Sequence, residues 1–237
     1  MTVDKINLPR KLHTKNHSKK KRTNSSHRWI SRHINDPYVA LAQDLGYRSR
    51  AAFKLIEIND KFNLFTRNTR ILDLGAAPGS WSQVANAKTL PKTNSQIIAL
   101  DLLAMSPIEN IVILQGDIND DEVVANIKSY HKKFDLIISD IAPNTVGHNQ
   151  TDHLRIMAIA DSVLELVFEL LEKNGALVVK IFQGELQQEF FLSLKKLFKK
   201  VHYFKPTSSR KESPEIYIVA KEYFYDQTQY SANYYKA

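Results

Sequence analysis

The chain has 237 residues, 43% of them hydrophobic and none of them cysteine, and its formal net charge at pH 7 is +8. This length and apolar content are typical of one globular domain with a short appendage, and the lack of cysteine excludes disulfides and thiolate metal sites and indicates a reducing, cytoplasmic compartment. No apolar run approaches the roughly 20 residues of a membrane span, and no apolar segment follows the basic N-terminus, so we expect neither a transmembrane helix nor a secretory signal.

The positive charge is concentrated at the N-terminus. Residues 1–33 contain ten Lys or Arg and one acid, so residues 34–237 carry a net charge of about −1. A basic arm on a near-neutral domain is a common way to bind a polyanion, and the alternative is a solvated, disordered tail. We expect a basic arm over residues 1–27, disordered without RNA, and an ordered domain over 28–222. The run is Lys-rich rather than Arg-rich, which disfavours a mitochondrial transit peptide.

Two helices are predicted before the first strand. Asp36 and Pro37 form a helix start, with Asp36 as the capping residue, and Gly46 ends that helix. Ser49 is predicted to cap a second helix, whose start carries Arg48, Arg50 and Lys54.

The chain then alternates apolar runs with helical stretches. Helical stretches are predicted at 80–87, 120–129, 152–173 and 185–198, and strands at 70–74, 96–100, 111–115, 134–139, 175–182, 200–204 and 215–221. Strands separated by helices indicate an α/β fold with a mainly parallel sheet. No helix separates the last two strands, so they form a terminal antiparallel hairpin. Seven strands in this arrangement match the Rossmann-like methyltransferase sheet. Residues 223–237 form a Tyr-rich polar tail with no predicted role.

The stretch from Ile71 to Trp81 predicts a strand, a tight glycine turn and a helix, which is how α/β folds bring backbone close to a nucleotide-like ligand. Gly75 and Gly79 can adopt positive φ and leave no Cβ between the chain and a ligand. The dinucleotide fingerprint requires a middle glycine where this chain has Ala77. A ligand with adenosine but no phosphates fits better, and S-adenosylmethionine is the common one.

Three acids follow predicted strands, at the edge where doubly wound sheets bind ligands. Asp101 is placed to accept hydrogen bonds from ribose hydroxyls, Asp117 could bind an adenine amino group, and Asp140 ends the fourth strand. The alternative for each is a cap on the next helix. That alternative is strongest for Asp117, because a helix starts soon after it.

Lys180 lies inside an apolar run that predicts a central strand, where a lysine is rare unless it is paired. The alternative is a side chain that reaches solvent from the strand end. Lys54 and Glu215 are well placed to join Lys180, although each alone is more often a surface charge.

Taken together, these motifs resemble the FtsJ family of ribosomal RNA large-subunit 2′-O-methyltransferases over about residues 28–222. The matching stretches are 48–55, 73–83, 115–117, 139–144, 178–184 and 206–210. The resemblance implies a catalytic tetrad of Lys54, Asp140, Lys180 and Glu215. It also implies S-adenosylmethionine contacts at Gly79, Trp81, Asp101, Asp117 and Asp140. Ser80 stands where the family usually has glycine, and the basic arm is longer than in well-known members.

The implied substrate is the 2′-hydroxyl of a uridine in the A-loop of 23S rRNA, met in the assembled large ribosomal subunit by a monomeric enzyme without a metal. Lys180 is the candidate general base, because burial and the nearby Lys54 cation would favour its neutral amine. Phosphate contacts are expected at Arg32, Arg48, Arg50, Arg210 and Lys211. The alternatives are a methyltransferase of tRNA or an mRNA cap, a non-catalytic ribosome-assembly or RNA-binding protein, and a nicotinamide-dependent oxidoreductase.

Overall fold

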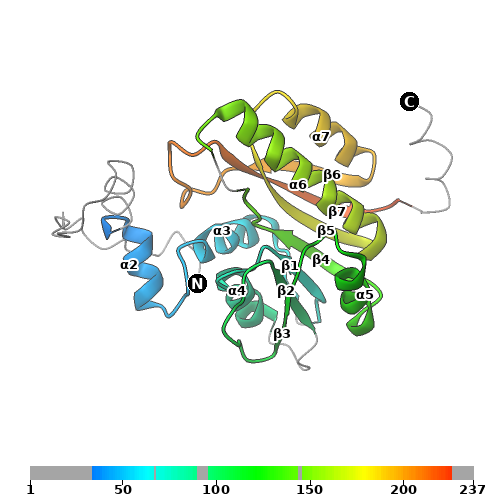
Figure 1. Cartoon of the computed structure of the whole chain (residues 1–237), viewed down its shortest axis with the longest axis horizontal. Coiled ribbons are helices and arrows are strands. Elements are labelled where there is room, and N and C mark those ends of the chain that lie inside the picture. The colour runs from blue at the N-terminus through cyan, green and yellow to red at the C-terminus, as the bar shows by residue number, and fades with distance from the viewer. Residues whose placement is uncertain (1–33, 67, 90–95, 144–145, 226–237) are drawn as a thin grey trace.

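The computed structural model describes residues 34–66, 68–89, 96–143 and 146–225, which fold around one seven-stranded sheet (Figure 1). The helices are α2 (Pro37–Asp44), α3 (Ala52–Phe62), α4 (Ser80–Thr89), α5 (Asp121–Tyr130), α6 (Asn149–Leu170) and α7 (Gln187–Lys195). The strands are β1 (Ile71–Leu74), β2 (Ile97–Asp101), β3 (Ile111–Gln115), β4 (Phe134–Ser139), β5 (Leu171–Phe182), β6 (Phe198–Phe204) and β7 (Glu215–Tyr223).

The strand order is β3-β2-β1-β4-β5-β7-β6. Strands β3, β2, β1, β4 and β5 are parallel, whereas β7 is antiparallel to both β5 and β6. The predicted α/β fold with a terminal antiparallel hairpin is therefore confirmed, and β7 inserts between β5 and β6.

Strand β5 begins earlier than predicted. It starts at Leu171, directly after α6, where the sequence predicted a strand from 175 and a helix to 173. Leu171 pairs with Phe134, and the register to β4 shifts between Phe134 and Leu136. This irregularity lets a polar segment that reads as a loop continue the ladder.

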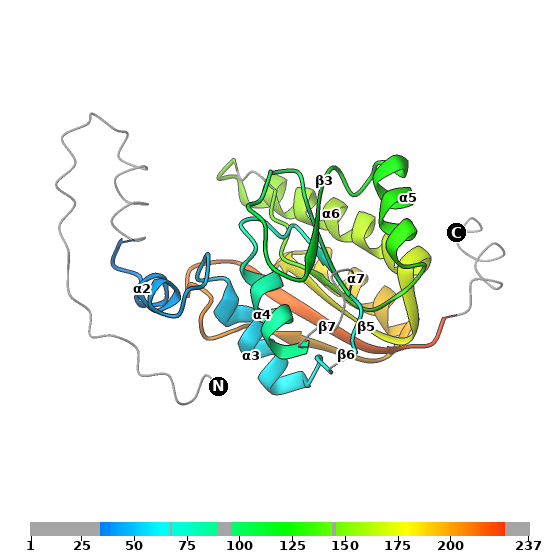
Figure 2. The ribbon, with the colours of Figure 1, turned by 90° about the horizontal axis from the view of Figure 1, so that it is seen from below.

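Helices cover both faces of the sheet, as Figures 1 and 2 show. One core packs α3 and α4 against alternate residues of the strands, among them Ile71, Ile138 and Val178. The other packs α5, α6 and α7 against the opposite residues, such as Leu72 and Val179. Both faces of the parallel strands are thus buried, which explains their continuous apolar runs.

Asp36 caps α2 as predicted, because its carboxylate accepts from the Tyr38 backbone N–H at 3.1 Å. Ser49 is not the cap of α3. The helix starts at Ala52 without a side-chain cap. The Ser49 hydroxyl accepts from the Ala51 N–H at 3.2 Å, just before the helix, and lies 2.8 Å from the Ser80 hydroxyl.

The strand order reverses between β1 and β4, and the carboxyl ends of the parallel strands meet beside that point. Open α/β sheets bind ligands at such a crevice. None of the helices in the described ranges is both long and apolar enough to cross a membrane. Tyr223 belongs to β7 and is buried, so the sheet continues one residue past the predicted boundary at 222. The N-terminal arm, Arg32 included, and residues 226–237 lie outside the described residues.

Candidate active site

The turn after β1 has the backbone that its glycines predict. Gly75 and Gly79 have φ values of +72° and +110°. A Cβ on Gly75 would lie 2.5 Å from the Ile141 side chain and 2.9 Å from its backbone, so any other residue here would push the turn away from the end of β4. The turn therefore needs glycine at position 75 for close packing as well as for its conformation.

A cavity of about 620 Å³ opens between this turn and the ends of β2, β3 and β4. Its lining includes Asp101, Asp117 and Asp140 together with apolar groups such as Leu102 and Pro143, and none of the described residues that line it is Lys or Arg. Carboxylates suit ribose hydroxyls, an amino group and a cationic sulfur, while a phosphate would meet only negative charge. The residues present thus fit S-adenosylmethionine and disfavour a dinucleotide. We call this cavity the cofactor pocket.

Asp101 and Asp117 both line the pocket, where a ligand can contact them. Asp101 accepts from the backbone N–H groups of Ala77 and Leu103, each at 2.8 Å, which fixes its carboxylate at the turn. Asp117 does not cap α5. Asp120 does so, and Asp117 accepts from the backbone and side chain of Asn119, each at 2.9 Å. The capping alternative for Asp117 is therefore excluded.

Lys180 and Asp140 form a buried ion pair at the inner edge of the cofactor pocket. The Lys180 Nζ lies 2.9 Å from Asp140 Oδ1 and donates to the Asp140 carbonyl at 2.6 Å. The Lys180 side chain is only 6% exposed, so it does not extend into bulk solvent. The alternative of a solvated lysine is excluded.

Lys54 and Glu215 form a second pair beside the first. The Lys54 Nζ lies 2.8 Å and 3.0 Å from the two carboxylate oxygens of Glu215. Both side chains are largely buried, at 12% and 13% exposure. Four elements thus bring the predicted tetrad together: α3, the end of β4, β5 and β7.

Tyr217 completes the cluster, although no role was predicted for it. Its hydroxyl donates to Asp140 Oδ1 at 2.6 Å, and its ring lies 5.7 Å from the Lys54 Nζ. Tyr217 pairs with Lys180 in the β5–β7 register. The sequence could have indicated Tyr217, because side chains alternate along a strand and Glu215 and Tyr217 therefore face the same side of β7.

The charges around Asp140 set its protonation. Burial by itself raises the pKa of Asp140, but the Lys180 and Lys54 cations and the Tyr217 hydrogen bond outweigh burial and lower it. Burial, with the charges of Asp140 and Glu215, raises the pKa of Tyr217 well above its ordinary value. Asp140 is therefore an anion held by two cations and a phenol that remains a donor.

Asp73 is a second residue without a predicted role. It is fully buried in β1, and burial, reinforced by the Asp140 and Asp101 charges, raises its pKa to about 7. The Ser82 hydroxyl donates to Asp73 Oδ2 at 2.6 Å, and Oδ1 has no hydrogen-bond partner in the described part of the chain.

Trp81 and Gly79 lie outside the cofactor-pocket lining. The Trp81 side chain is buried, its Nε1 donates to the Ala51 carbonyl at 2.9 Å, and its ring packs on Tyr217. The cofactor contacts expected at these two residues remain predictions.

A separate cavity of about 450 Å³, which we call the acceptor pocket, has the Lys54–Glu215 pair in its wall. It is lined by Ser49, Arg50, Ala51, Lys54, Arg210, Glu212, Ser213 and Glu215. Lys54 and Glu215 therefore connect it to the tetrad.

The predicted phosphate-binding side chains have different surroundings. Arg48 donates to the carbonyls of Pro78, Ser106 and Pro107, and Arg50 to Asp36 and the Ser208 carbonyl. Lys211 is exposed, whereas Arg210 is partly exposed and lies 3.5 Å from Asp36.

Sequence comparison relates most of the chain to one family. The model of the FtsJ-like methyltransferase family matches residues 47–223. Two proteins named "Ribosomal RNA large subunit methyltransferase E" are similar to the chain. That of Granulibacter bethesdensis is 47% identical over 203 residues, covering 85% of this chain and 86% of its own. That of Acidiphilium cryptum is 43% identical over 224 residues, covering 94% and 98%.

Solved structures show the same fold. A ribosomal RNA methyltransferase from Plasmodium falciparum superposes with a TM-score of 0.69 at 35% identity, covering 76% of this chain and all of that one. A fibrillarin/Nop5p complex superposes with a TM-score of 0.51 at 20% identity, covering 74% and 85%, and shares the fold alone.

Proposed function

Because the chain belongs to the FtsJ-like methyltransferase family, we propose that it transfers a methyl group from S-adenosylmethionine to the 2′-hydroxyl of a uridine in the A-loop of 23S rRNA. The names of its relatives support large-subunit ribosomal RNA as the substrate. The observation that carries the chemistry is the buried ion pair of Lys180 with Asp140, which lines the cofactor pocket.

The bound cofactor supplies an electrophilic methyl group on a cationic sulfur. Asp101 is placed to bind its ribose hydroxyls, and Asp117 is placed to bind its adenine amino group. Asp140 complements the positive charge from the inner end of the pocket. The acid-lined, cation-free walls support these assignments.

Lys180 acts as the general base. A neutral amine has two N–H groups and one lone pair. The two N–H groups are directed to the carbonyl and the carboxylate of Asp140, which leaves the lone pair for the proton of the attacking hydroxyl.

Lys54 and Glu215 position the acceptor nucleotide. Their ion pair forms one wall of the acceptor pocket, beside Arg50 and Arg210. A ribose fixed there would have its hydroxyl directed at Lys180, and positioning of this kind is worth about 7–11 kcal/mol in favourable cases. The tetrad lies within one chain, which supports a monomeric enzyme. Its proposed ribosomal substrate and its lack of cysteine support a cytoplasmic location.

Methylation of large ribosomal subunits from cells that lack this activity tests the proposal. We expect labelled S-adenosylmethionine to mark a single ribose of 23S rRNA. Lys180→Ala should slow single-turnover transfer by about 100-fold or more, the typical contribution of a general base, and leave cofactor affinity unchanged.

Lys173→Ala is the matched control, because Lys173 is an exposed lysine of the same strand. A label on tRNA or capped mRNA instead of 23S rRNA would refute the substrate. Near wild-type transfer by the Lys180 variant would refute the base.

A further inference from the structure

A third cavity, of about 780 Å³, adjoins the acceptor pocket, and we call it the flanking pocket. It is lined by Gly147, Asn149, Asp152, Phe182, Gln183, Lys205, Lys211, Glu212, Ser213 and Pro214. Glu212 and Ser213 line both cavities. An RNA strand whose ribose enters the acceptor pocket therefore has a second compartment next to it.

Two side-chain amides give this pocket the chemistry to read a base. Gln183 and Asn149 are exposed, and among the described residues no hydrogen bond involves either amide group. A carboxamide carries both a donor and an acceptor, which lets it pair with two neighbouring atoms on a base edge. Proteins read single-stranded RNA through such edges.

Cationic side chains lie beside the amides. Lys211 is exposed, and the Lys205 Nζ donates to the Ser213 carbonyl at 2.8 Å, where it supports the loop and adds positive charge. Glu212 lines both pockets, and its negative charge disfavours a phosphate between them. A backbone phosphate is therefore best placed at Lys211.

Hydrogen bonds to backbone groups hold the walls of the pocket. The Gln183 N–H donates to the Pro214 carbonyl at 2.9 Å, which ties the end of β5 to the loop before β7. Asp152 accepts from the N–H groups of Val146 and Gly147 at 2.8 and 3.1 Å. Gln183 also lies only three residues after Lys180 on the same chain segment, so the amide and the base share one rigid support.

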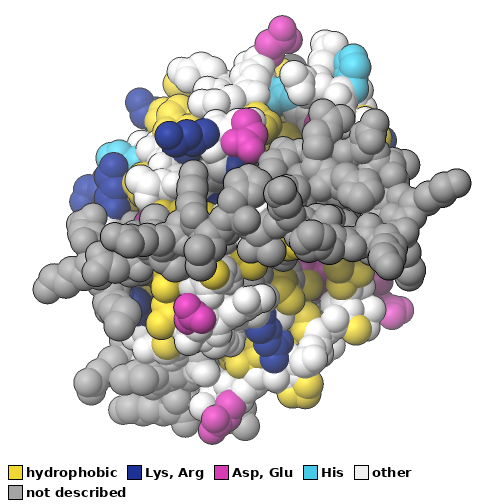
Figure 3. All heavy atoms as spheres, turned by 90° about the vertical axis from the view of Figure 1, so that its left-hand side faces the viewer, with side chains coloured by type: hydrophobic (Ala, Val, Ile, Leu, Met, Phe, Trp, Pro, Cys, Tyr) yellow, Lys and Arg dark blue, Asp and Glu magenta, His cyan; other side chains and the backbone are white. Residues whose placement is uncertain are grey.

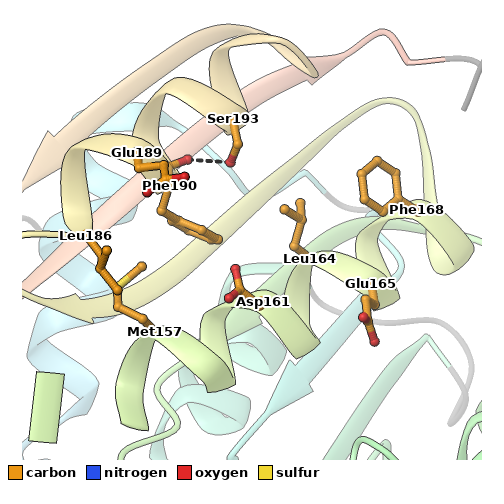
Figure 4. Close-up of a pocket in the computed structure, with 9 residues that line it drawn as sticks. All are labelled: Met157, Asp161, Leu164, Glu165, Phe168, Leu186, Glu189, Phe190 and Ser193. Atoms are coloured by element: carbon orange, nitrogen blue, oxygen red, sulfur yellow. Dashed lines mark hydrogen bonds between the residues drawn. The ribbon is translucent and has the colours of Figure 1, made fainter. Parts of the chain in front are cut away.

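The groove between α6 and α7 is acidic and is therefore poorly suited to bind RNA. Figure 4 shows Asp161, Glu165 and Glu189 around its apolar floor. Burial and the two glutamates raise the pKa of Asp161, as expected where like charges crowd. A phosphate would add to that repulsion.

Figure 3 shows the left-hand face of Figure 1, where Lys and Arg side chains appear on both sides of the grey atoms. The loop of residues 205–214 and the start of α6 lie toward this side in Figure 1. Both contribute residues to the flanking pocket.

We propose that the flanking pocket binds the nucleotide next to the methylated one, with Gln183 and Asn149 on its base edge and Lys211 on its phosphate. This inference rests on the proposed function, because it requires an RNA substrate in the acceptor pocket. It makes Gln183 and Asn149 determinants of sequence context rather than catalytic residues.

A cycle of RNA and protein substitutions tests the inference. The substrates are large subunits that carry either the natural base or a substituted base on each side of the mapped methylation site. With the wild-type enzyme, we expect the substitution at one of the two positions to lower kcat/KM about tenfold, the size of one lost base contact. With Gln183→Ala or Asn149→Ala, kcat/KM should already be low on the natural RNA, through KM, and should change less than twofold on substitution.

Gln150→Ala is the matched control, because Gln150 is the exposed neighbour of Asn149 and does not line the pocket. It should retain the full tenfold discrimination. Equal discrimination by the wild type and both amide variants would overturn the inference, as would a wild-type enzyme indifferent to both flanking bases. Neither outcome would touch the proposed function, which fails only if the wild type does not methylate the RNA.

Discussion

At the scale of single residues, the Asp140 carboxylate is the hub of the cluster. Its Oδ1 atom accepts from the Lys180 ammonium at 2.9 Å and from the Tyr217 hydroxyl at 2.6 Å. Tyr217 thus restrains the group that positions the base without itself lining the cofactor or acceptor pocket. We regard it as a positioning residue.

Tyr217→Phe should lower kcat about tenfold, with little change in KM or in cofactor affinity, because it removes one hydrogen bond to a charged group. Single-turnover rates and titration calorimetry measure these quantities. Tyr223→Phe is the matched control, since Tyr223 lies in the same strand and its hydroxyl has no hydrogen-bond partner among the described residues. A Tyr217 variant with unchanged kcat would show that the hydroxyl does not restrain Asp140.

Asp73 predicts a pH dependence of stability. Its pKa is raised to about 7 in the folded protein, above the ordinary value of 3.8. The folded state therefore binds this proton more tightly than the unfolded state. The stability that this proton contributes is therefore lost as pH rises from about 4 to about 7, by at most about 1.4 kcal/mol per pH unit, and the contribution is gone above that range.

Asp73→Asn should flatten this slope between about pH 4 and 7 in urea unfolding, because the amide does not ionise and its carbonyl can still accept from Ser82. Asp44→Asn, at an exposed position of α2, should keep the wild-type slope. A slope that survives in Asp73→Asn would assign the titration to another group.

At the scale of elements, most of the fold could be predicted because each strand is a short apolar run between polar segments. Lys180 was recognisable because an ammonium inside such a run requires a partner. The start of β5 was not, since Glu172, Lys173 and Asn174 read as a loop and only the pairing of Leu171 with Phe134 shows that the strand begins before them.

Contacts between distant segments account for the other misses. Besides the Ala51 N–H, the Ser49 hydroxyl has a partner on α4, 31 residues away in the sequence. Tyr217 is an ordinary strand residue until the register places it opposite Lys180. Local sequence patterns do not reveal the Ser49–Ser80 contact or the position of Tyr217 opposite Lys180.

Arg48 joins three segments around the cofactor pocket. Its guanidinium donates to the Pro78 carbonyl at 3.0 Å and to those of Ser106 and Pro107 at 2.8 Å each. It therefore ties the glycine turn to the loop after β2, and its expected phosphate contact stays a prediction.

Arg48→Ala should weaken cofactor binding about tenfold, since the turn and the loop lose three charge-assisted hydrogen bonds. Arg48→Lys should not restore affinity, because one ammonium lacks the planar fork that reaches several carbonyls. Calorimetric titration with S-adenosylmethionine measures both variants. Unchanged affinity in Arg48→Ala would mean that the turn holds its shape without this side chain.

At the scale of the whole molecule, charge is divided between a basic N-terminal arm and a near-neutral domain. Phosphate contacts release counterions, so the logarithm of RNA affinity should fall linearly with the logarithm of salt concentration. Lys211→Ala should reduce that slope by about one contact, and removal of residues 1–27 should reduce it by several. The exposed Lys173→Ala should leave the slope unchanged. Equal slopes in all four proteins would place the RNA contacts elsewhere.

Strand β7 is the last to be synthesised but lies inside the sheet, and this order has a consequence for how the protein is made. Glu215 and Tyr217 arrive on the last strand of the sheet, yet that strand lies between two that are made before it. A nascent chain can assemble the glycine turn and the acids around it while β5 and β6 still present unpaired edges, which are prone to association with other chains. With the proposed roles of Glu215 and Tyr217, methyl transfer would have to wait until translation has passed the final strand, and a chain truncated just before it would be both inactive and inclined to aggregate.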